Sequence, residues 1–185
     1  NALIENSVLV GNCAYFKGKS FTHNVDHCRA LGNTLAAFFT TGAKITVVNS
    51  TLYGNGDVLL MSGHRGDTAC DGTEQLIAVN NIFLGDTEYH APSEKAAAFY
   101  TEDCKGLTLQ ESYGVVYNVK GGCTLGTNDL CADPQLGPLS GDKYGMMPAK
   151  GSPAIDSGKA VGGIIPSDDF MKLSRPLGKG VERGA

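Results

Sequence analysis

The stretch KITVVNSTLYG, residues 44–54, reads as two short strands on either side of a polar bend. Similar phrases occur at residues 75–85 (QLIAVNNIFLG), 2–11 (ALIENSVLVG) and, more faintly, 106–116 (GLTLQESYGVV). Aligning the bends places four residues in one column, separated by 43, 31 and 31 positions: Asn6, Asn49, Asn80 and Glu111. A recurring period in this range is typical of repeat proteins, in which each unit stacks on its neighbour.

A third apolar segment precedes each of the later phrases, at residues 35–41, 58–63 and 96–102. Each repeat is therefore expected to hold three short strands joined by a turn and a bend. Stacked in parallel ladders, such units predict an all-β solenoid, a parallel β-helix of about four coils. The coils would occupy residues 1–118, and a loop-rich C-terminal segment, residues 119–185, would pack on the last coils within a single domain.

Alternation along the first strand of each phrase predicts which side chains face the interior. The expected inward residues are Ile45, Leu76, Leu107, Val47, Ala78 and Leu109. The expected outward residues are Thr46, Val48, Ile77, Val79, Thr108 and Gln110. The outward set contains no carboxylate, lysine or arginine.

The asparagines at the bends suggest an internal ladder. Asparagine tolerates a left-handed backbone, and its amide can donate and accept bonds above and below. We therefore expect Asn6, Asn49 and Asn80 to form a buried structural ladder; the alternative is three surface turn asparagines. An internal Asn49 could not be glycosylated, although residues 49–51 read as an N-glycosylation sequon.

The six cysteines favour disulfides over a zinc cluster, because their number is even and no C-x-x-C motif occurs. The repeat alignment favours the pairs Cys13–Cys28, Cys70–Cys104 and Cys123–Cys131. The first pair would bracket a polar insertion at residues 13–34, expected to be a loop with a short helical turn. Disulfides imply an oxidising compartment; the alternative is six free thiols in a cytosolic protein.

Length and charge narrow the class of protein. The 185 residues suffice for one domain with a substantial core, and the formal net charge of −4 gives no basic stripe for nucleic acid. No apolar run approaches the roughly 20 residues of a membrane-spanning helix. Because the chain begins inside a strand-like repeat, we expect a mature or trimmed fragment of a longer protein.

The C-terminal sequence contains DPQL at residues 133–136, GSPAIDSG at 151–158 and RPLG at 175–178. This series resembles the closing segment of bacterial choice-of-anchor Q domain surface proteins, within the pectate-lyase-like superfamily. Ser157 departs from the alanine usual in that pattern. The resemblance implies a right-handed β-helix, secreted or on the bacterial cell surface, but it implies no single activity.

The resemblance also implies what a catalytic face would need. Polysaccharide lyases of this superfamily place calcium-binding carboxylates and a basic residue on the outer face of one sheet. Apart from Glu5, the outward face is expected to have no carboxylate, lysine or arginine. We therefore assign no catalytic residue. A loop with three carboxylates, Asp67, Asp71 and Glu74, is a candidate calcium site, the alternative being a solvated turn. A second candidate, His23, Asp26 and His27, could ligate a transition metal or lie in a surface loop.

Three hypotheses on function follow. The first is a non-catalytic extracellular domain with a structural, adhesive or polysaccharide-contacting role. The alternative is a fragment of a polysaccharide lyase or glycoside hydrolase, so enzymatic activity is left open. The third is self-assembly into a homo-oligomer, because the end of a solenoid exposes unpaired strand edges.

Overall fold

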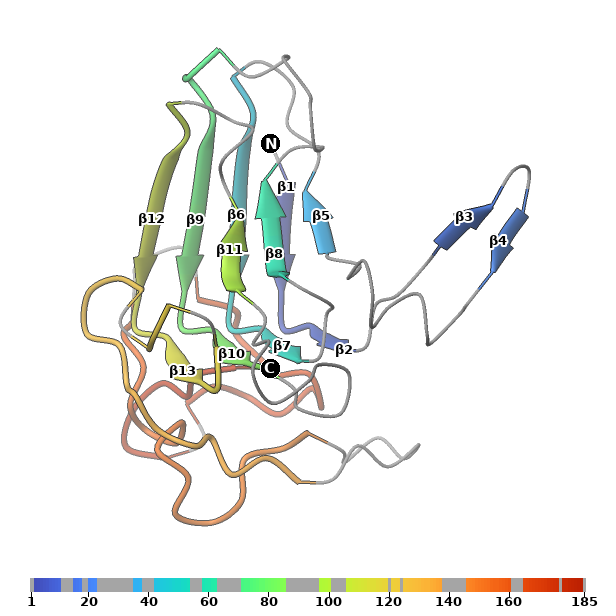
Figure 1. The fold of residues 1–185 in the computed structure, drawn as a ribbon. Coiled ribbons are helices and arrows are strands. Elements are labelled where there is room, and N and C mark those ends of the chain that lie inside the picture. Colours follow the sequence, from blue (N-terminus) through green and yellow to red (C-terminus); the bar gives the residue numbers. More distant parts are fainter. Residues whose placement is uncertain are drawn as a thin grey trace.

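The computed structural model describes residues 2–10, 15–17, 20–22, 35–37, 42–53, 58–62, 71–85, 97–100, 106–119, 121–123, 125–137, 146–160, 165–176 and 178–184. These residues contain strands and turns but no helix (Figure 1). We call the strands of one repeat a rung. The rungs are β1 (Ala2–Glu5) and β2 (Val8–Val10); β5 (Leu35–Ala37), β6 (Lys44–Val48) and β7 (Thr51–Tyr53); β8 (Val58–Ser62), β9 (Gln75–Val79) and β10 (Ile82–Leu84); and β11 (Ala97–Tyr100), β12 (Thr108–Ser112) and β13 (Val115–Tyr117).

Equivalent strands of successive rungs pair in parallel and form three sheets. Their orders are β1-β6-β9-β12, β13-β10-β7-β2 and β11-β8-β5. The predicted strands at residues 44–53 and the third strand of each later repeat are therefore confirmed, although the third strands are shorter than expected. Figure 1 shows the three long strands β6, β9 and β12 side by side, with the short β7, β10 and β13 below them.

A continuous apolar core fills the space between the sheets. It is built from buried residues of the second, third and fourth rungs and of the segment that follows: Ile45, Val47, Leu52, Leu76, Ala78, Phe83, Ala98, Val116 and Val119. Ile4 of the first rung is partly buried against it. The inward positions predicted for the second and third rungs are thus buried. Burying each large apolar side chain contributes about 1.5–3 kcal/mol before the entropy cost of folding, so the stacked columns stabilise the sheets on one another.

The register of the last rung differs from the sequence alignment. Gln75 pairs with Thr108 and Ala78 with Glu111, so this repeat is spaced by 33 residues rather than 31. Glu111 is consequently not a bend residue. It occupies the inward column of Ala78, and the bend residue is Tyr113, with a φ of 58°.

The shift of two residues keeps the alternation of the strand. Leu107 is half-buried against the core, as predicted, just before the pair Gln75–Thr108. Leu109 pairs with the buried Leu76 rather than with Ala78, and it is 36 % exposed at the end of the stack, against the prediction. On the outer face, Val48 and Val79 are also buried, so only the part of that face away from the bends is open.

A short fifth turn closes the C-terminal end of the core. We call residues 121–123 and 125–131 the cap. Isolated parallel bridges join Ser112 to Thr127 and Val115 to Leu130, so the cap follows the last rung at a spacing of 15 residues. Leu125 and Cys123 of the cap pack against the core.

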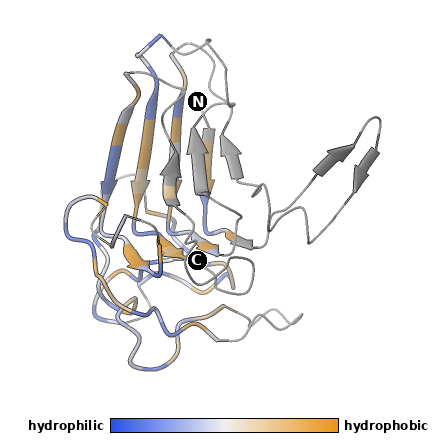
Figure 2. Ribbon diagram, viewed as in Figure 1, coloured by the Kyte–Doolittle hydropathy of each residue, from blue (hydrophilic) through white to orange (hydrophobic). Residues whose placement is uncertain are grey.

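The last part of the C-terminal segment is described at residues 146–160, 165–176 and 178–184, and these residues form turns and isolated bridges rather than strands. Figure 1 shows it in orange and red beneath the ends of the rungs, next to β7, β10 and β13. A second apolar cluster joins it to that sheet, with Ala154 against Ile82 and Val115. Figure 2 shows the hydrophobic short strands facing this segment.

The insertion predicted at residues 13–34 contains an antiparallel hairpin of β3 (Tyr15–Lys17) and β4 (Ser20–Thr22). The hairpin projects away from the three sheets (Figure 1). The sequence indicated a loop there and not strands. The helical turn expected in the rest of the insertion lies outside the described residues.

Candidate functional site

The bend asparagines share a left-handed backbone. The value of φ is 47° at Asn6, 46° at Asn49 and 56° at Asn80, a region that asparagine enters more readily than most residues. The registers of β1, β6 and β9 stack the three residues as predicted. Asn49 and Asn80 are fully buried, so the sequon at residues 49–51 is inaccessible in the folded chain.

Their side chains bind the C-terminal segment more than they bind one another. The side-chain nitrogen of each asparagine donates to a main-chain oxygen of that segment. Asn6 binds Asp168 at 2.5 Å, Asn49 binds Glu182 at 2.7 Å and Asn80 binds Lys159 at 2.9 Å. Asn80 Oδ1 also accepts the N–H of Lys159 at 2.9 Å. Among the described residues, one contact joins two of these amides, from Asn80 Nδ2 to Asn49 Oδ1 at 3.5 Å. The asparagine column is therefore a docking line along the first three rungs.

The polar ladder between rungs lies one residue further along the chain. Ser50 Oγ accepts the main-chain N–H of Ser7 at 3.3 Å, and Asn81 Oδ1 accepts that of Ser50 at 2.9 Å. Asp129 Oδ1 accepts that of Gly114 at 2.9 Å. Each side-chain oxygen thus satisfies the main chain of the rung before it.

Asn81 is a buried residue of this ladder that the sequence did not single out. Its Nδ2 donates to the main-chain oxygen of Val47 at 2.9 Å, while its Oδ1 binds Ser50. The signal available was the doubled asparagine at residues 80 and 81. Only the parallel register shows that the second amide, rather than the first, bridges two rungs.

Glu111 lies at the end of the core in a charged cluster. It is 7 % exposed, and neither Oε1 nor Oε2 has a hydrogen-bond partner among the described residues. Burial, first, and then Asp129 raise the pKa of Glu111 to about 9, and Arg183 opposes them. At neutral pH this carboxyl is therefore protonated.

Asp129 and Arg183 bring the cap and the C-terminal segment to the same place. Besides its bond to Gly114, Asp129 accepts the N–H groups of Leu125 and Gly126 at 2.8 and 2.7 Å through Oδ2. These amides orient the Asp129 side chain and shape the cap. The carboxylate of Asp129 in the cap thus lies near the carboxyl group of Glu111 in β12.

Arg183 joins the last rung, the cap and its own segment through main-chain oxygens. Its guanidinium donates to Gly114 at 2.7 Å, to Asn128 at 3.0 Å and to Ser157 at 2.7 and 3.0 Å. It also lies over the Tyr113 ring, 5.6 Å from the centroid. Burial lowers the pKa of Arg183 from its ordinary value, and Asp129 and Glu111 oppose that shift.

Arg175 plays a similar part nearby. Its side chain is 2 % exposed and lies 3.6 Å from the carboxylate of Glu182. It also donates to the main-chain oxygens of Asp168 at 3.1 Å and Gly184 at 2.9 Å. The carboxylate partner of Arg175 is thus Glu182, from its own segment. Together with Asp169, Met147 and other residues, both arginines line a cavity of about 270 Å³ within the C-terminal segment.

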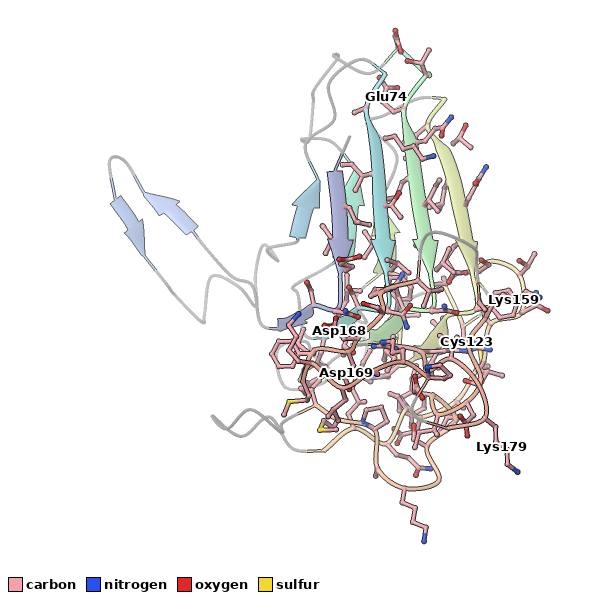
Figure 3. All side chains as sticks on the ribbon, turned by 180° about the vertical axis from the view of Figure 1, so that it is seen from behind. Glu74, Cys123, Lys159, Asp168, Asp169 and Lys179 are labelled. Carbon is pink, nitrogen blue, oxygen red and sulfur yellow. A yellow bond between two sulfur atoms is a disulfide. The ribbon has the colours of Figure 1, made fainter. Side chains whose placement is uncertain are left out.

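Two of the three candidate calcium residues, Asp71 and Glu74, lie at the opposite end of the long sheet. Figure 3 shows Glu74 far from Asp168, Asp169 and Lys159. Glu74 is buried, and its carboxylate accepts the N–H groups of Asp71 and Gly72 at 3.2 and 2.9 Å. Asp71 accepts both the N–H and the hydroxyl of Thr73. These bonds form a turn; Asp67 lies outside the described residues, so the calcium site stays a prediction.

Of the predicted disulfides, Cys123–Cys131 is present and links two positions of the cap that are 8 residues apart in the sequence. Cys13, Cys28, Cys70 and Cys104 lie outside the described residues. So do the candidate transition-metal ligands His23, Asp26 and His27. Within the part of the chain that the structure describes, no three His, Cys, Asp or Glu side chains gather as a metal site.

Comparison of the chain with protein-family models, with curated proteins and with solved structures gave no match. Among the described residues, no helix is long and apolar enough to cross a membrane. The resemblance to surface β-helix proteins therefore depends on the motifs in the sequence.

Proposed function

We propose that the rungs are coils of a right-handed parallel β-helix and that the chain is a non-catalytic, extracellular structural module. The parallel register of equivalent strands supports the first part of this proposal. The second part draws on the resemblance of the C-terminal sequence to bacterial choice-of-anchor Q domain surface proteins of the pectate-lyase-like superfamily. The Cys123–Cys131 disulfide suits a secreted or cell-surface location.

The main support for a non-catalytic role is what the ionisable side chains of the interior bind. Most of the buried or partly buried ionisable side chains bind the main chain: Glu74, Asp129, Asp169, Arg175 and Arg183. Charged groups at an active site are instead directed at a substrate, often within a cleft. This pattern is what a scaffold needs to hold an irregular C-terminal segment on regular rungs.

The open part of the long sheet is the surface we propose for contact with polysaccharide. Neighbouring rungs place Lys44, Gln75 and Thr108 side by side, and all three are exposed. Amide, ammonium and hydroxyl groups spaced by one strand can hydrogen-bond successive sugars. A glycan array tests this contact, with Gln75→Ala and Thr108→Ala expected to weaken any signal and Lys150→Ala, on the C-terminal segment, as the control. Absence of binding to any glycan would leave the scaffold role alone.

A fragment of a polysaccharide lyase or glycoside hydrolase is the second candidate. One observation favours it: Glu111 is protonated at neutral pH beside the second carboxyl of Asp129, the state required of a general acid. Burial of Glu111 opposes it, because a substrate would have to displace the cap. A calcium ion held by Asp67, Asp71 and Glu74 would favour this enzymatic function over the structural one. Release of reducing ends or of unsaturated uronates from a polysaccharide panel, lost in Glu111→Gln, would establish it.

Self-association through the first rung is compatible with either role. β1 and β2 are edge strands of their sheets, and Ile4 is only partly buried against the core. The other end of the core is closed by the cap, so stacking is expected to give a dimer and not a fibre. Light scattering should then show a concentration-dependent dimer, which Ile4→Lys abolishes; a monomer at all concentrations would exclude it.

A further inference from the structure

The interior column that contains Glu111 is apolar in the two preceding rungs. Glu111 follows Ala78 and Val47 in register. Both of these residues are fully buried. A carboxyl group at the third position therefore lies where the core would otherwise end, directly under the cap.

Two glycines make room for this side chain. A Cβ atom on Gly126 of the cap would collide with the main-chain oxygen and Oε2 of Glu111. A Cβ atom on Gly114 would lie 2.6 Å from Oε1. Neither glycine has the positive φ that would by itself call for glycine. Glycine at these two positions therefore allows the cap and the bend after β12 to approach the Glu111 carboxyl group closely.

The charged and titratable groups around Glu111 come from three elements. Asp129 belongs to the cap, Arg183 to the C-terminal segment and Tyr113 to the bend after β12. Asp129 already accepts three main-chain N–H groups, and Arg183 already makes four bonds to three main-chain oxygens. Asp129 would therefore repel a second carboxylate, and Arg183 could turn to it only by giving up bonds to the main chain.

We propose that Glu111, Asp129 and Arg183 form a proton-dependent latch that holds the cap and the C-terminal segment on the last rung. In the closed state the carboxyl of Glu111 is neutral, so it lies near Asp129 without adding a second negative charge. Loss of the Glu111 proton to solvent base places two carboxylates together under the cap. Their repulsion and the hydration of Glu111 then favour opening of the cap, and with it release of the bonds from Arg183 to Gly114 and Asn128. This latch goes beyond the structural role and does not depend on it.

The direction of the pH effect follows from the raised pKa of Glu111, about 9 against an ordinary 4.5. The folded chain keeps this proton where the unfolded chain has lost it. The contribution to stability is therefore complete below about pH 4.5, declines as the pH rises, and is lost above about 9. The latch is closed in acidic and neutral surroundings and opens in alkaline ones.

Two measurements on the full chain test the latch. The first is the thermal midpoint of unfolding between pH 6 and 9.5, which we expect to fall by at least ~5 °C in the wild type. Glu111→Gln, which cannot ionise, should show little of that fall. Glu5→Gln, the same change at an exposed site of the first rung, should keep the wild-type profile.

The second measurement locates the opening. A water-soluble phosphine reduces disulfides across this pH range, and alkylation followed by mass spectrometry identifies which pair has opened. We expect Cys123–Cys131 to be reduced severalfold faster in the wild type than in Glu111→Gln at pH 9, with equal rates at pH 6. Comparing the two proteins at each pH removes the effect of pH on the reagent.

A second variant, Glu111→Ala, introduces the residue found at the equivalent position 78 of the preceding rung. It shows whether the effect of Glu111→Gln comes from loss of the ionisable group or from the glutamine side chain itself. Both variants should flatten the pH profile if the proton on Glu111 controls the cap. An equal loss of stability in the wild type and both variants would overturn the proposal. The proposal would also be overturned if Cys123–Cys131 were reduced at the same rate in the wild type and in Glu111→Gln at pH 9.

Discussion

The side chain of Asn49 donates a hydrogen bond to the main-chain oxygen of Glu182, 133 residues later, at 2.7 Å. The residue that terminates the strand of the most regular repeat is therefore also an anchor for the least regular part of the chain. Asn6 and Asn80 make the equivalent bonds on either side. The C-terminal segment thus reaches the first rung as well as the last, further than its expected position on the last coils.

The first prediction concerns this anchor. Asn49→Gly keeps the left-handed backbone but removes the amide. It should lower the free energy of unfolding by about 1–3 kcal/mol, because the main-chain oxygen of Glu182 then keeps only the longer bond from Arg175, at 3.5 Å. Asn49→Ala should cost about 1 kcal/mol more, since alanine resists a φ of 46°. Urea unfolding measures both. Equal stability of the glycine variant and the wild type would show that the anchor contributes nothing.

The second prediction concerns the ladder residue Asn81. Asn81→Leu has nearly the same size but leaves the N–H of Ser50 without its acceptor and removes the amide bond to the oxygen of Val47. We expect a loss of about 2–5 kcal/mol, more than at Asn49, because two buried groups are affected instead of one. Gln75→Leu, an exposed position of the same rung, is the control and should change stability by less than about 0.5 kcal/mol. Similar losses at both positions would contradict the ladder.

The third prediction concerns Arg183. Arg183→Lys keeps the charge, but an ammonium group cannot span the oxygens of Gly114, Asn128 and Ser157 together. We expect a loss of about 2–4 kcal/mol. Lys172→Gln removes an exposed ion pair with Asp168 and should cost at most about 1 kcal/mol. Chemical denaturation compares the two, and a tolerated lysine at position 183 would show that charge alone suffices there.

The fourth prediction concerns the disulfide of the cap. Replacing Cys123 and Cys131 together by serine opens a loop with a sequence separation of 8. The loop-entropy model gives a loss of about 2–3 kcal/mol. Because the rungs pair independently of this loop, far-ultraviolet circular dichroism should keep its strand signal. Collapse of that signal at ambient temperature would mean that the cap is required for the rungs to form.

Much of the rung architecture could be predicted because its causes are local and repeated. The phrase at residues 44–54 has an apolar alternation and a bend asparagine that specify β6, the bend and β7. The third strands were visible as apolar segments. The position of Glu111 could not be predicted in the same way, because a shift of two residues keeps every side chain on the same face. Alternation alone cannot distinguish a spacing of 31 from one of 33.

The sequence by itself determined that equivalent short strands recur, that Asn6, Asn49 and Asn80 fall at the bends, and that Cys123 and Cys131 bracket a closed loop. Only the tertiary structure decided what these features contact. It joins the asparagines to the C-terminal segment, moves the inter-rung ladder to Ser50 and Asn81, and places Glu111 inside the core. The physical reason is that these contacts depend on the register between distant segments, and register is set by the packing of the whole stack and not by any one repeat.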